Sequence, residues 1–422
     1  MQLNSDIRTR LQLICERAES NLSDNLMPFW ANHTWDTEYG GFLTRLDQRG
    51  RRLETDEKIL IMQVRMIASL SLAHRFGLND RGYLELAGKG FDFLVRNMWD
   101  PQEGGFYFSV TRDGKAKSQR KNTDFHAYAI LGLTEYYRAS GRKEPLEWAE
   151  RVFDLLLTKA ADRDRGFIED FDDATWPVLN DDQMNLGGRQ GIKTIDMHTN
   201  VMEAFMYLSR VTHSPRHLEA LRNVVTLVKE KGIHTEHGCS ITALDYDWNP
   251  IPDGRGKTTT SYGLNAEIAW LMLEAVDVLQ ERRERYRRTI LVLVDHALEF
   301  GFDHERGGLA AYGPMAGRVT EATDLNENRL LKTWWAQAEM LNALVDVYQW
   351  TEHPRYLEAF IKLFDWIWTF QIDHEYGDWY QETFWDSGQA VTTHKGGEWK
   401  TAFHASRALV RVATTLRKML AE

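Results

Sequence analysis

The sequence predicts an all-α fold, an (α/α)6 barrel of six helical hairpins with short β-hairpins crowning one end. Three observations support this prediction. One turn motif recurs six times, helical stretches occur in pairs between its copies, and the connections between helices alternate between short and long. We expect the functional site at the crowned end.

The turn motif is an Asp or His followed four residues later by Gly, usually with a second Gly and an aromatic residue. Asp36 begins the first copy, DTEYGGF, and Asp373 begins the last, DHEYGDW. A period this regular indicates one supersecondary unit copied along the chain, so we expect residues 1–422 to form a single domain. The motif glycines are 62 to 72 residues apart: Gly40, Gly104, Gly166, Gly238, Gly307 and Gly377.

Each turn opens a short alternating stretch that predicts a β-hairpin, as at 42–50 and 106–114. Two helical stretches separate each hairpin from the next. The predicted helices cover 4–30, 56–76, 83–99, 121–138, 145–160, 193–210, 214–231, 262–280, 283–301, 329–350, 354–371 and 400–420.

The helix after each hairpin is the more apolar of its pair, as in GLNAEIAWLMLEAV, which predicts a buried inner ring. Its partner carries more charge, as in RRERYRRTILVLVDHALEF, and belongs outside. Inner-to-outer connections are short, whereas outer-to-inner connections are long and contain the hairpins. The hairpins therefore gather where the inner helices begin, and loops on a rigid scaffold are where binding and catalysis usually occur.

Composition excludes several classes of protein. A net charge of −11 without a basic stripe argues against a nucleic-acid partner, and no run of about 18 apolar residues exists to span a membrane. The N-terminal residues lack a secretory signal and only two cysteines occur, so we expect a cytoplasmic protein without disulfides. The sequence has no Gly-rich phosphate loop, HExxH motif or cysteine cluster, so we expect neither a nucleotide cofactor nor a metal. A homo-oligomer is compatible with the sequence, which leaves the oligomeric state open.

Polar residues recur about one turn inside the inner helices, and in a closed ring they converge on the axis. Histidines, an arginine and several carboxylates at matching positions predict a catalytic pocket. Nearby tryptophans, including Trp335 and Trp399, are typical of a sugar site because a flat ring packs on C–H faces while its N–H stays free. The converging residues are Arg65, Asp124, His126, Asp196, His198, Glu267, Glu339 and His404.

These segments resemble the superfamily of N-acylglucosamine 2-epimerase and cellobiose 2-epimerase, which also includes mannose isomerases, over nearly the full chain. KGGEWKTAFHASR (395–407) is similar to the family's K-x-G-x-W-K-x-x-x-H-x-x-R, and KTWWAQAE (332–339) is similar to K-x-W-W-x-Q-A-E. The resemblance implies a cofactor-independent carbohydrate isomerase or 2-epimerase. Its substrate would be a mannose- or glucose-type free aldose or a short oligosaccharide with a reducing end.

The resemblance also implies roles for individual residues. His404 occupies a general acid/base position, Glu267 the position of a supporting carboxylate, and His198 that of a retained family histidine. We expect these three residues to be catalytic. Arg65 lies where the O1/O2 region of the sugar is bound. The other expected substrate contacts are Asp124, His126, Asp196, Trp335, Glu339 and Trp399.

The segment SYGLNAEIAW departs from the family's S-Y-G-H-x-x-E-x-x-W, because Leu264 replaces a second catalytic histidine. A histidine can remove the C2 proton of an open-chain aldose and form a cis-enediolate. Epimerisation then needs a proton on the opposite face of C2, whereas aldose–ketose isomerisation needs only one base on one face. Leu264 therefore favours isomerisation. The candidates to replace the missing group are Asp124, His126, Asp196 and His198.

Two other functions remain open from the sequence. The first is an inverting glycoside hydrolase on the same barrel, with two of Asp124, Asp196 and Glu267 as its carboxyl pair. The second is a non-catalytic sugar-binding relative that has lost one base. Exchange of sugar hydrogen in heavy water and release of sugar from a glycoside distinguish these readings.

Overall fold

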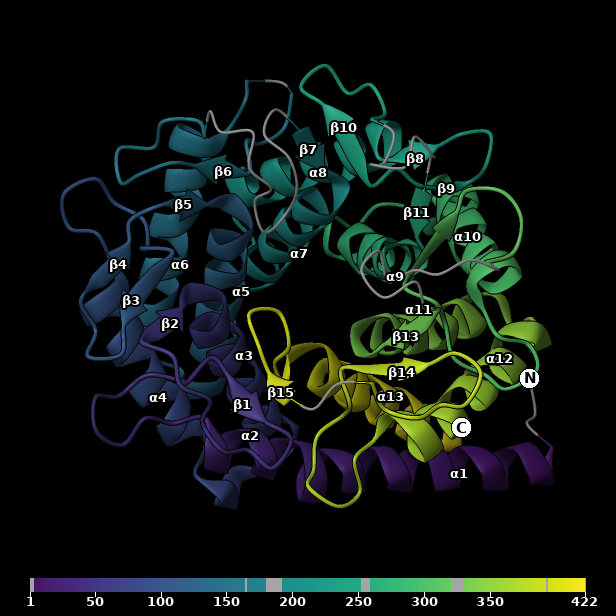
Figure 1. Cartoon of the computed structure of the whole chain (residues 1–422). Coiled ribbons are helices and arrows are strands. Elements are labelled where there is room, and N and C mark those ends of the chain that lie inside the picture. Colours follow the sequence, from purple (N-terminus) through teal and green to yellow (C-terminus); the bar gives the residue numbers. More distant parts are fainter. Residues whose placement is uncertain are drawn as a thin grey trace.

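The computed structural model describes residues 4–163, 165–179, 192–251, 259–319, 330–391 and 394–421. In this part of the chain, six helices form a closed inner ring (Figure 1). Each ring helix packs against the next, and the last, α13, packs against the first, α3. The predicted (α/α)6 barrel is therefore confirmed. The ring helices are α3 (Leu60–Phe76), α5 (Thr123–Ser140), α7 (Ile195–Thr212), α9 (Tyr262–Val278), α11 (Trp334–Thr351) and α13 (Phe403–Ala421).

The outer helices surround this ring, and α4, α6, α8, α10 and α12 each pack against the ring helix before them in sequence. Several of them end in a π-helical turn, which continues α4 through Met98 and α6 through Ala160. The N-terminal α1 packs against the C-terminal α13 and so completes the outer layer. The outer helices are α1 (Ser5–Ser20), α2 (Met27–His33), α4 (Tyr83–Phe93), α6 (Lys143–Leu155), α8 (Pro215–Lys231), α10 (Arg287–His296) and α12 (Pro354–Trp366).

Burial explains the two layers. In α3 every residue from Leu60 to Ser71 is buried, whereas α8 buries only a stripe along one side. A helix apolar on all sides is stable only when it is enclosed, and a helix with one apolar stripe belongs at the surface. The ring is also tight, since a Cβ on Gly132 of α5 would lie 2.6 Å from the carbonyl oxygen of Val64 in α3. Glycine at this position permits the two helices to approach closely.

Short strands link neighbouring repeats rather than closing only local hairpins. The strand before a ring helix pairs with a strand from the following repeat, and β1 pairs with β15 to join the two ends of the chain. The stretch predicted as a hairpin at 42–50 thus contributes its strand to a distant partner. The pairs are β1 (Leu46–Asp47) with β15 (His394–Gly396), β2 (Glu57–Ile59) with β3 (Ser109–Thr111), β3 with β4 (Ala116–Ser118), β5 (Lys121–Asn122) with β6 (Asp170–Phe171), β7 (Ile192–Thr194) with β10 (Ala243–Asp245), β8 (Ile233–His234) with β9 (Cys239–Ser240), β11 (Thr259–Ser261) with β12 (Tyr312–Pro314), and β13 (Leu331–Thr333) with β14 (Glu382–Phe384).

These strands correct several predicted helix starts. The helix predicted from residue 56 begins at Leu60, and the helix predicted from residue 400 begins at Phe403. The residues before Leu60 instead have extended backbone and pair with β3. Pairing between repeats depends on tertiary structure, so the helical pattern alone placed this boundary too early.

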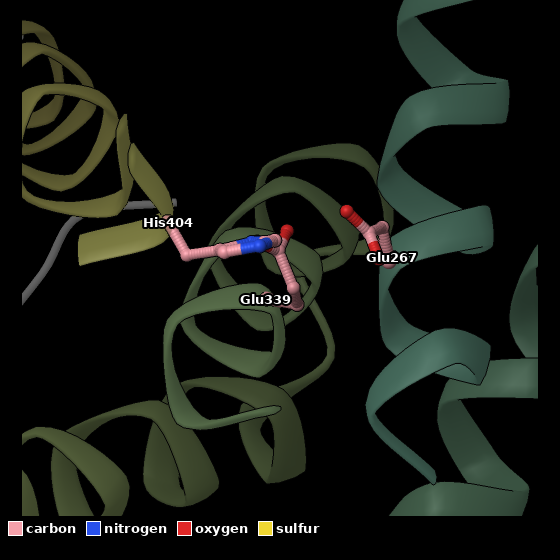
Figure 2. Close-up of side chains that lie close together, drawn as sticks. All are labelled: Glu267, Glu339 and His404. Atoms are coloured by element: carbon pink, nitrogen blue, oxygen red, sulfur yellow. The ribbon is translucent and has the colours of Figure 1, made fainter. Parts of the chain in front are cut away.

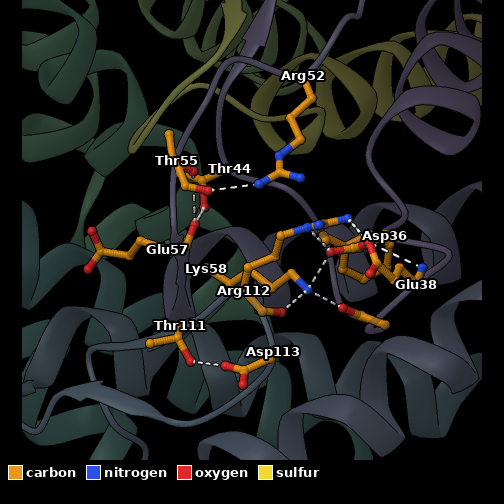
Figure 3. A network of polar contacts seen from close by, with 12 residues as sticks. Asp36, Glu38, Thr44, Arg52, Thr55, Glu57, Lys58, Thr111, Arg112 and Asp113 are labelled. Carbon is orange, nitrogen blue, oxygen red and sulfur yellow. Dashed lines mark hydrogen bonds and ion pairs between the residues drawn. The ribbon is translucent and has the colours of Figure 1, made fainter.

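The motif aspartates have a structural role that the repeat did not reveal. Lys58 Nζ lies 3.0 Å from Asp36 Oδ2 and donates to the carbonyl of Gly40, which fixes the turn against β2 (Figure 3). Arg112 adds a second cation on the same carboxylate, with Nε 2.9 Å from Oδ2. A buried charge requires such a partner. The equivalent pairs are Lys121–Asp100, Lys193–Asp162, Lys332–Asp303 and Lys395–Asp373.

None of the helices in the described ranges is both long enough and apolar enough to cross a membrane.

Candidate active site

His404 lies at the start of α13 with one ring nitrogen held and the other open. Its Nδ1 is 2.6 Å from Glu339 Oε1 on α11 (Figure 2). No hydrogen bond reaches Nε2 from the residues that the structure describes. Burial lowers the pKa of His404 to about 4, although Glu339 partly opposes this effect. At neutral pH the ring is therefore uncharged, with Nδ1–H donating to Glu339 and an Nε2 lone pair available.

Glu339 is completely buried and ionised. Its Oε1 also accepts from Arg407 Nη2 at 2.7 Å, and its Oε2 accepts from the Trp270 indole at 2.8 Å. Burial alone would raise its pKa, but Arg407 and His404 lower the pKa of Glu339 to about 2. An ionised carboxylate in this position orients the His404 ring and selects its tautomer.

One guanidinium serves three carboxyl groups at the centre of the ring. Arg407 contacts Glu203 on α7, Glu267 on α9 at 3.1 Å, and Glu339. Burial raises the pKa of Glu267 well above its usual range, with the charge of Glu339 adding to the effect, and burial also raises the pKa of Glu203. One cation cannot neutralise three buried anions, so protonation of Glu267 and Glu203 removes the excess charge while Glu339 stays ionised.

Among the described residues, Glu267, Glu339 and His404 form the one group with the composition of a metal site, with ligand atoms within 4.8 Å of one another. Figure 2 shows their side chains converging from three ring helices. Arg407 touches both carboxylates, so a guanidinium already provides the positive charge that a cation would bring. The two carboxylates and the histidine are therefore held together by hydrogen bonds with Arg407 and with one another.

Arg65 on α3 is a buried cation without a carboxylate partner among the described residues. Its Nη1 donates to the Trp399 carbonyl at 2.9 Å, and its guanidinium lies 4.1 Å from the centre of the Tyr128 ring. Its Nε is buried and makes no hydrogen bond. Aromatic faces stabilise a cation without neutralising it. Arg65 therefore keeps both its charge and donor capacity for a ligand.

Asp124 on α5 and Asp196 on α7 form a second acidic group. Asn200 Nδ2 donates to Asp124 Oδ1 at 2.8 Å, and Asn200 also interacts with Asp196. Burial, assisted by the charge of Asp196, raises the pKa of Asp124 to about 7, and burial raises the pKa of Asp196. Asp196 nevertheless keeps an exposed side chain. Asp196 is therefore the member of this pair that a ligand can reach.

Tyr312 in β12 has the same combination of properties. It is 45% exposed, yet burial among protein atoms raises its pKa, and the charges of Asp196 and Glu267 add to this effect. Its ring centre is 6.3 Å from that of Trp335. Tyr312 therefore lies close to Asp196 at the same accessible surface of the site. The sequence pattern did not point to Tyr312, because it lies in a strand of a long loop, outside the repeating helix starts.

The predicted histidines on α5 and α7 do not face this surface. His126 accepts the Phe106 N–H at Nε2, 2.8 Å away, and its Nδ1 is 2.7 Å from the Asn122 carbonyl. His198 repeats this arrangement, with Nε2 3.0 Å from the Phe167 nitrogen and Nδ1 2.7 Å from the Thr194 carbonyl. Both ring nitrogens of each histidine are therefore used to hold the turn of their own repeat.

Helix geometry separates the two sets of polar residues. Successive helical residues are about 100° apart, so His126 and Asp124, two positions apart, lie on nearly opposite faces. The same applies to His198 and Asp196. Residues four apart share a face, which places Asn200 beside Asp196 and Glu339 beside Trp335. Other repeats fill the turn-holding position with Gln63, Asn265 and Gln337.

The Trp334 and Trp335 rings lie near His404, and the ring centre of Trp334 is 6.5 Å from that of His404. The ring centre of Trp335 lies 6.2 Å from that of His404, and both Trp335 and Trp399 are partly exposed. A Cβ on Gly263 would lie 2.6 Å from the Trp335 ring, so glycine there allows the indole to lie against α9. The next residue, Leu264, is 3% exposed and sits in the first turn of α9. Its side chain supplies no ionisable group to this part of the site.

Of the predicted residues, His404 contacts Glu339 directly, and Arg407 links Glu339 to Glu267. The structure also places Asp124 beside Asp196. Arg65 lies near both groups, since its charge lowers the pKa values of His404, Asp124 and Asp196. His126 and His198 lie outside this arrangement. The spacing within KGGEWKTAFHASR is a signal for Arg407, because a residue three positions after His404 lies on the same helix face.

The comparisons with known proteins agree with this fold. The family model for N-acylglucosamine 2-epimerase (GlcNAc 2-epimerase) matches residues 40–408. Cellobiose 2-epimerase from Ruminococcus albus is 26% identical over 408 residues, covering 95% of this chain and 99% of the relative. D-mannose isomerase from Marinomonas mediterranea is 23% identical, covering 93% of this chain and 95% of its own. The solved structure of cellobiose 2-epimerase from Spirochaeta thermophila has a TM-score of 0.87 and 26% identity, covering 99% of this chain and all of that one (100%).

An (α/α)6 barrel with a buried histidine–carboxylate pair at its centre defines the class, a carbohydrate epimerase or isomerase. The chain belongs to the N-acylglucosamine 2-epimerase family.

Proposed function

We propose that the protein interconverts an aldose and its ketose, without a cofactor, and that 2-epimerisation is the lesser reaction. The substrate is a mannose- or glucose-type free sugar or the reducing end of a short oligosaccharide. The observation that supports this most directly is the open Nε2 of His404, which Glu339 holds in the tautomer of a general base. The names of the relatives support the substrate class.

His404 removes the C2 proton from the open-chain aldose. Neutral imidazole is suited to this step because its lowered pKa keeps it unprotonated at pH 7. As the C2–H bond breaks, a C1–C2 double bond forms and negative charge develops on O1. Arg65 stabilises that oxyanion, because its guanidinium is positively charged and pairs with no carboxylate among the described residues.

Return of the proton to C1 from the same side gives the ketose. Return to C2 from the opposite face would give the epimer, and Leu264 supplies no acid for that step. Glu267 supports the cluster through Arg407. We leave His198 out of proton transfer because its two nitrogens are bonded to backbone groups.

The test is a panel of mannose, glucose, fructose, N-acetylglucosamine, N-acetylmannosamine and cellobiose, followed by NMR in heavy water. The proposal expects ketose formation from at least one aldose, with solvent deuterium incorporated at the carbon that receives the proton. Absence of both exchange and conversion for every sugar would contradict it and favour a sugar-binding protein. Release of free sugar from cellobiose would instead identify a glycoside hydrolase.

A further inference from the structure

We infer that Asp124 and Asp196 form a proton shuttle between O1 and O2 of the sugar, on the opposite side of the site from His404. The inference deepens the proposed function and rests on it. Aldose–ketose conversion moves hydrogen at oxygen as well as at carbon, because O1 gains a proton and O2 loses one. His404 has one open nitrogen, and that nitrogen serves the carbon atoms.

The ring places the aspartates across from the base. In the closed order of ring helices, α13 has α11 and α3 as neighbours, and α7 has α5 and α9. Helix α7 therefore lies opposite α13, with α5 beside it (Figure 1). Asp196 on α7 and Asp124 on α5 begin their helices at the same end as His404 begins α13.

The two carboxyls act as one unit. Asn200 Nδ2 lies 2.8 Å from Asp124 Oδ1 and also interacts with Asp196, so one amide joins the pair. The Tyr128 hydroxyl fixes this amide by donating to Asn200 Oδ1 at 3.1 Å. Asp196 is exposed, whereas its neighbour Asp124 is only 7% exposed. Substrate oxygens can therefore reach the pair at Asp196, and the hydrogen bonds of Asn200 and Tyr128 hold the two carboxyls in position before a substrate binds.

Arg65 independently indicates where the sugar oxygens lie. Its Nη1 donates to the Trp399 carbonyl, and no carboxylate among the described residues pairs with the guanidinium, so its charge remains available to a sugar oxygen. Its charge acts on His404 and on both aspartates. A sugar with O1 at Arg65 thus lies between the base and the acidic pair.

The proton inventory closes without another reactant. His404 Nε2 takes the C2 proton, and the electrons of the C2–H bond form the C1–C2 double bond and leave an oxyanion at O1, which Arg65 stabilises. The protonated carboxyl then gives its proton to O1. The ionised carboxyl then takes the O2 hydroxyl proton, C2=O forms, and His404 delivers its proton to C1. The pair ends with one proton, as it began. The raised pKa of Asp124, about 7 through burial and the neighbouring Asp196 charge, is that of a carboxyl able to hold this proton near neutrality.

The test separates chemistry at carbon from chemistry at oxygen. D-mannose and cellobiose are the probes, and NMR in heavy water follows both deuterium entry at C2 of the aldose and formation of the ketose. Asp196→Asn should lower ketose formation by about 10²-fold, the usual scale of general acid–base catalysis, while C2 exchange by His404 changes little. Asp124→Asn should show the same split, which guards against misfolding of either variant. Asp172→Asn is the matched control, since it changes an exposed carboxylate in the same connection before α7.

A parallel loss of exchange and conversion in folded aspartate variants would assign them a structural or binding role and overturn the shuttle. Unchanged ketose formation would also overturn it. A wild-type protein that neither exchanges nor converts any sugar of the panel, these two probes included, would contradict the proposed function itself, so the two failures are distinguishable.

Discussion

The Nδ1 atom of His404 lies 2.6 Å from Oε1 of Glu339, and this contact decides which nitrogen of the histidine is free. The carboxylate is ionised because Arg407 and His404 lower its pKa to about 2 against the effect of burial. The carboxylate therefore accepts a hydrogen bond from Nδ1–H, and in this tautomer of the neutral ring Nε2 carries no proton.

His404→Asn should keep the fold and lower turnover by about 10²-fold or more, because general base catalysis contributes at least that factor. Sugar conversion measured by NMR, alongside thermal melting, checks this result. Near-normal turnover by a folded variant would exclude His404 as the base.

Glu339→Gln should lower kcat by about tenfold or more, since a neutral amide neither orients the ring nor stabilises its protonated form as a carboxylate does. Glu339 raises the pKa of His404, so its loss should lower that pKa further. The acid limb of kcat/KM, expected near pH 4 where His404 protonates, should therefore move to lower pH. An acid limb that stays in place or moves upward would contradict the assigned pair.

Arg65→Gln should lower kcat/KM by about 10²-fold, because it removes the cation proposed to stabilise the O1 oxyanion. Arg65→Lys should recover only part of this loss, since an ammonium cannot reproduce the planar donor arrangement. Steady-state kinetics on the folded fraction separates catalysis from stability. If the folded variants keep wild-type kinetics and only their melting temperature falls, Arg65 is a structural residue.

His198→Gln should retain activity, because Gln63 and Gln337 already hold the equivalent turns of other repeats. Burial lowers the pKa of His198 to about 4, whereas an unfolded histidine has a pKa of about 6.5. Below about pH 6.5 the unfolded state binds a proton that the folded state does not, so stability falls as pH decreases towards 4. The variant should therefore lose less melting temperature than wild type between pH 7 and pH 4.

The matched variant for this comparison is His126→Gln, which changes the same position of the preceding repeat. A large loss of turnover confined to His198→Gln, in a folded protein, would restore His198 to the catalytic group.

Leu264→His should raise the fraction of epimer among the products, since it restores a titratable group in the first turn of α9. The position is 3% exposed, and an unpaired buried polar group costs about 1–3 kcal/mol, so the variant should also melt at a lower temperature. Product ratios by NMR provide the measurement. Fast, balanced epimerisation by the unmodified protein would show that another residue already serves the second face.

The sequence by itself determined the ring and the identity of the proposed base. Six turn motifs and paired helical stretches predicted the barrel because repeated units bury their apolar faces only against one another. His404 followed from its place in KGGEWKTAFHASR. The residues 42–50 showed the limit of local pattern, since the partner of Leu46–Asp47 is β15, at the other end of the chain.

Only the tertiary structure decided which polar residues act together. His126 and Asp124 lie two positions apart, and the sequence placed both in the pocket, yet the histidine holds a turn and the aspartate faces Asn200. Likewise, Glu203, Glu267 and Glu339 come from three helices and share one guanidinium, Arg407. The physical reason is that periodicity fixes the face of a helix, whereas charge state and hydrogen-bond partners depend on what neighbouring helices bring to that face.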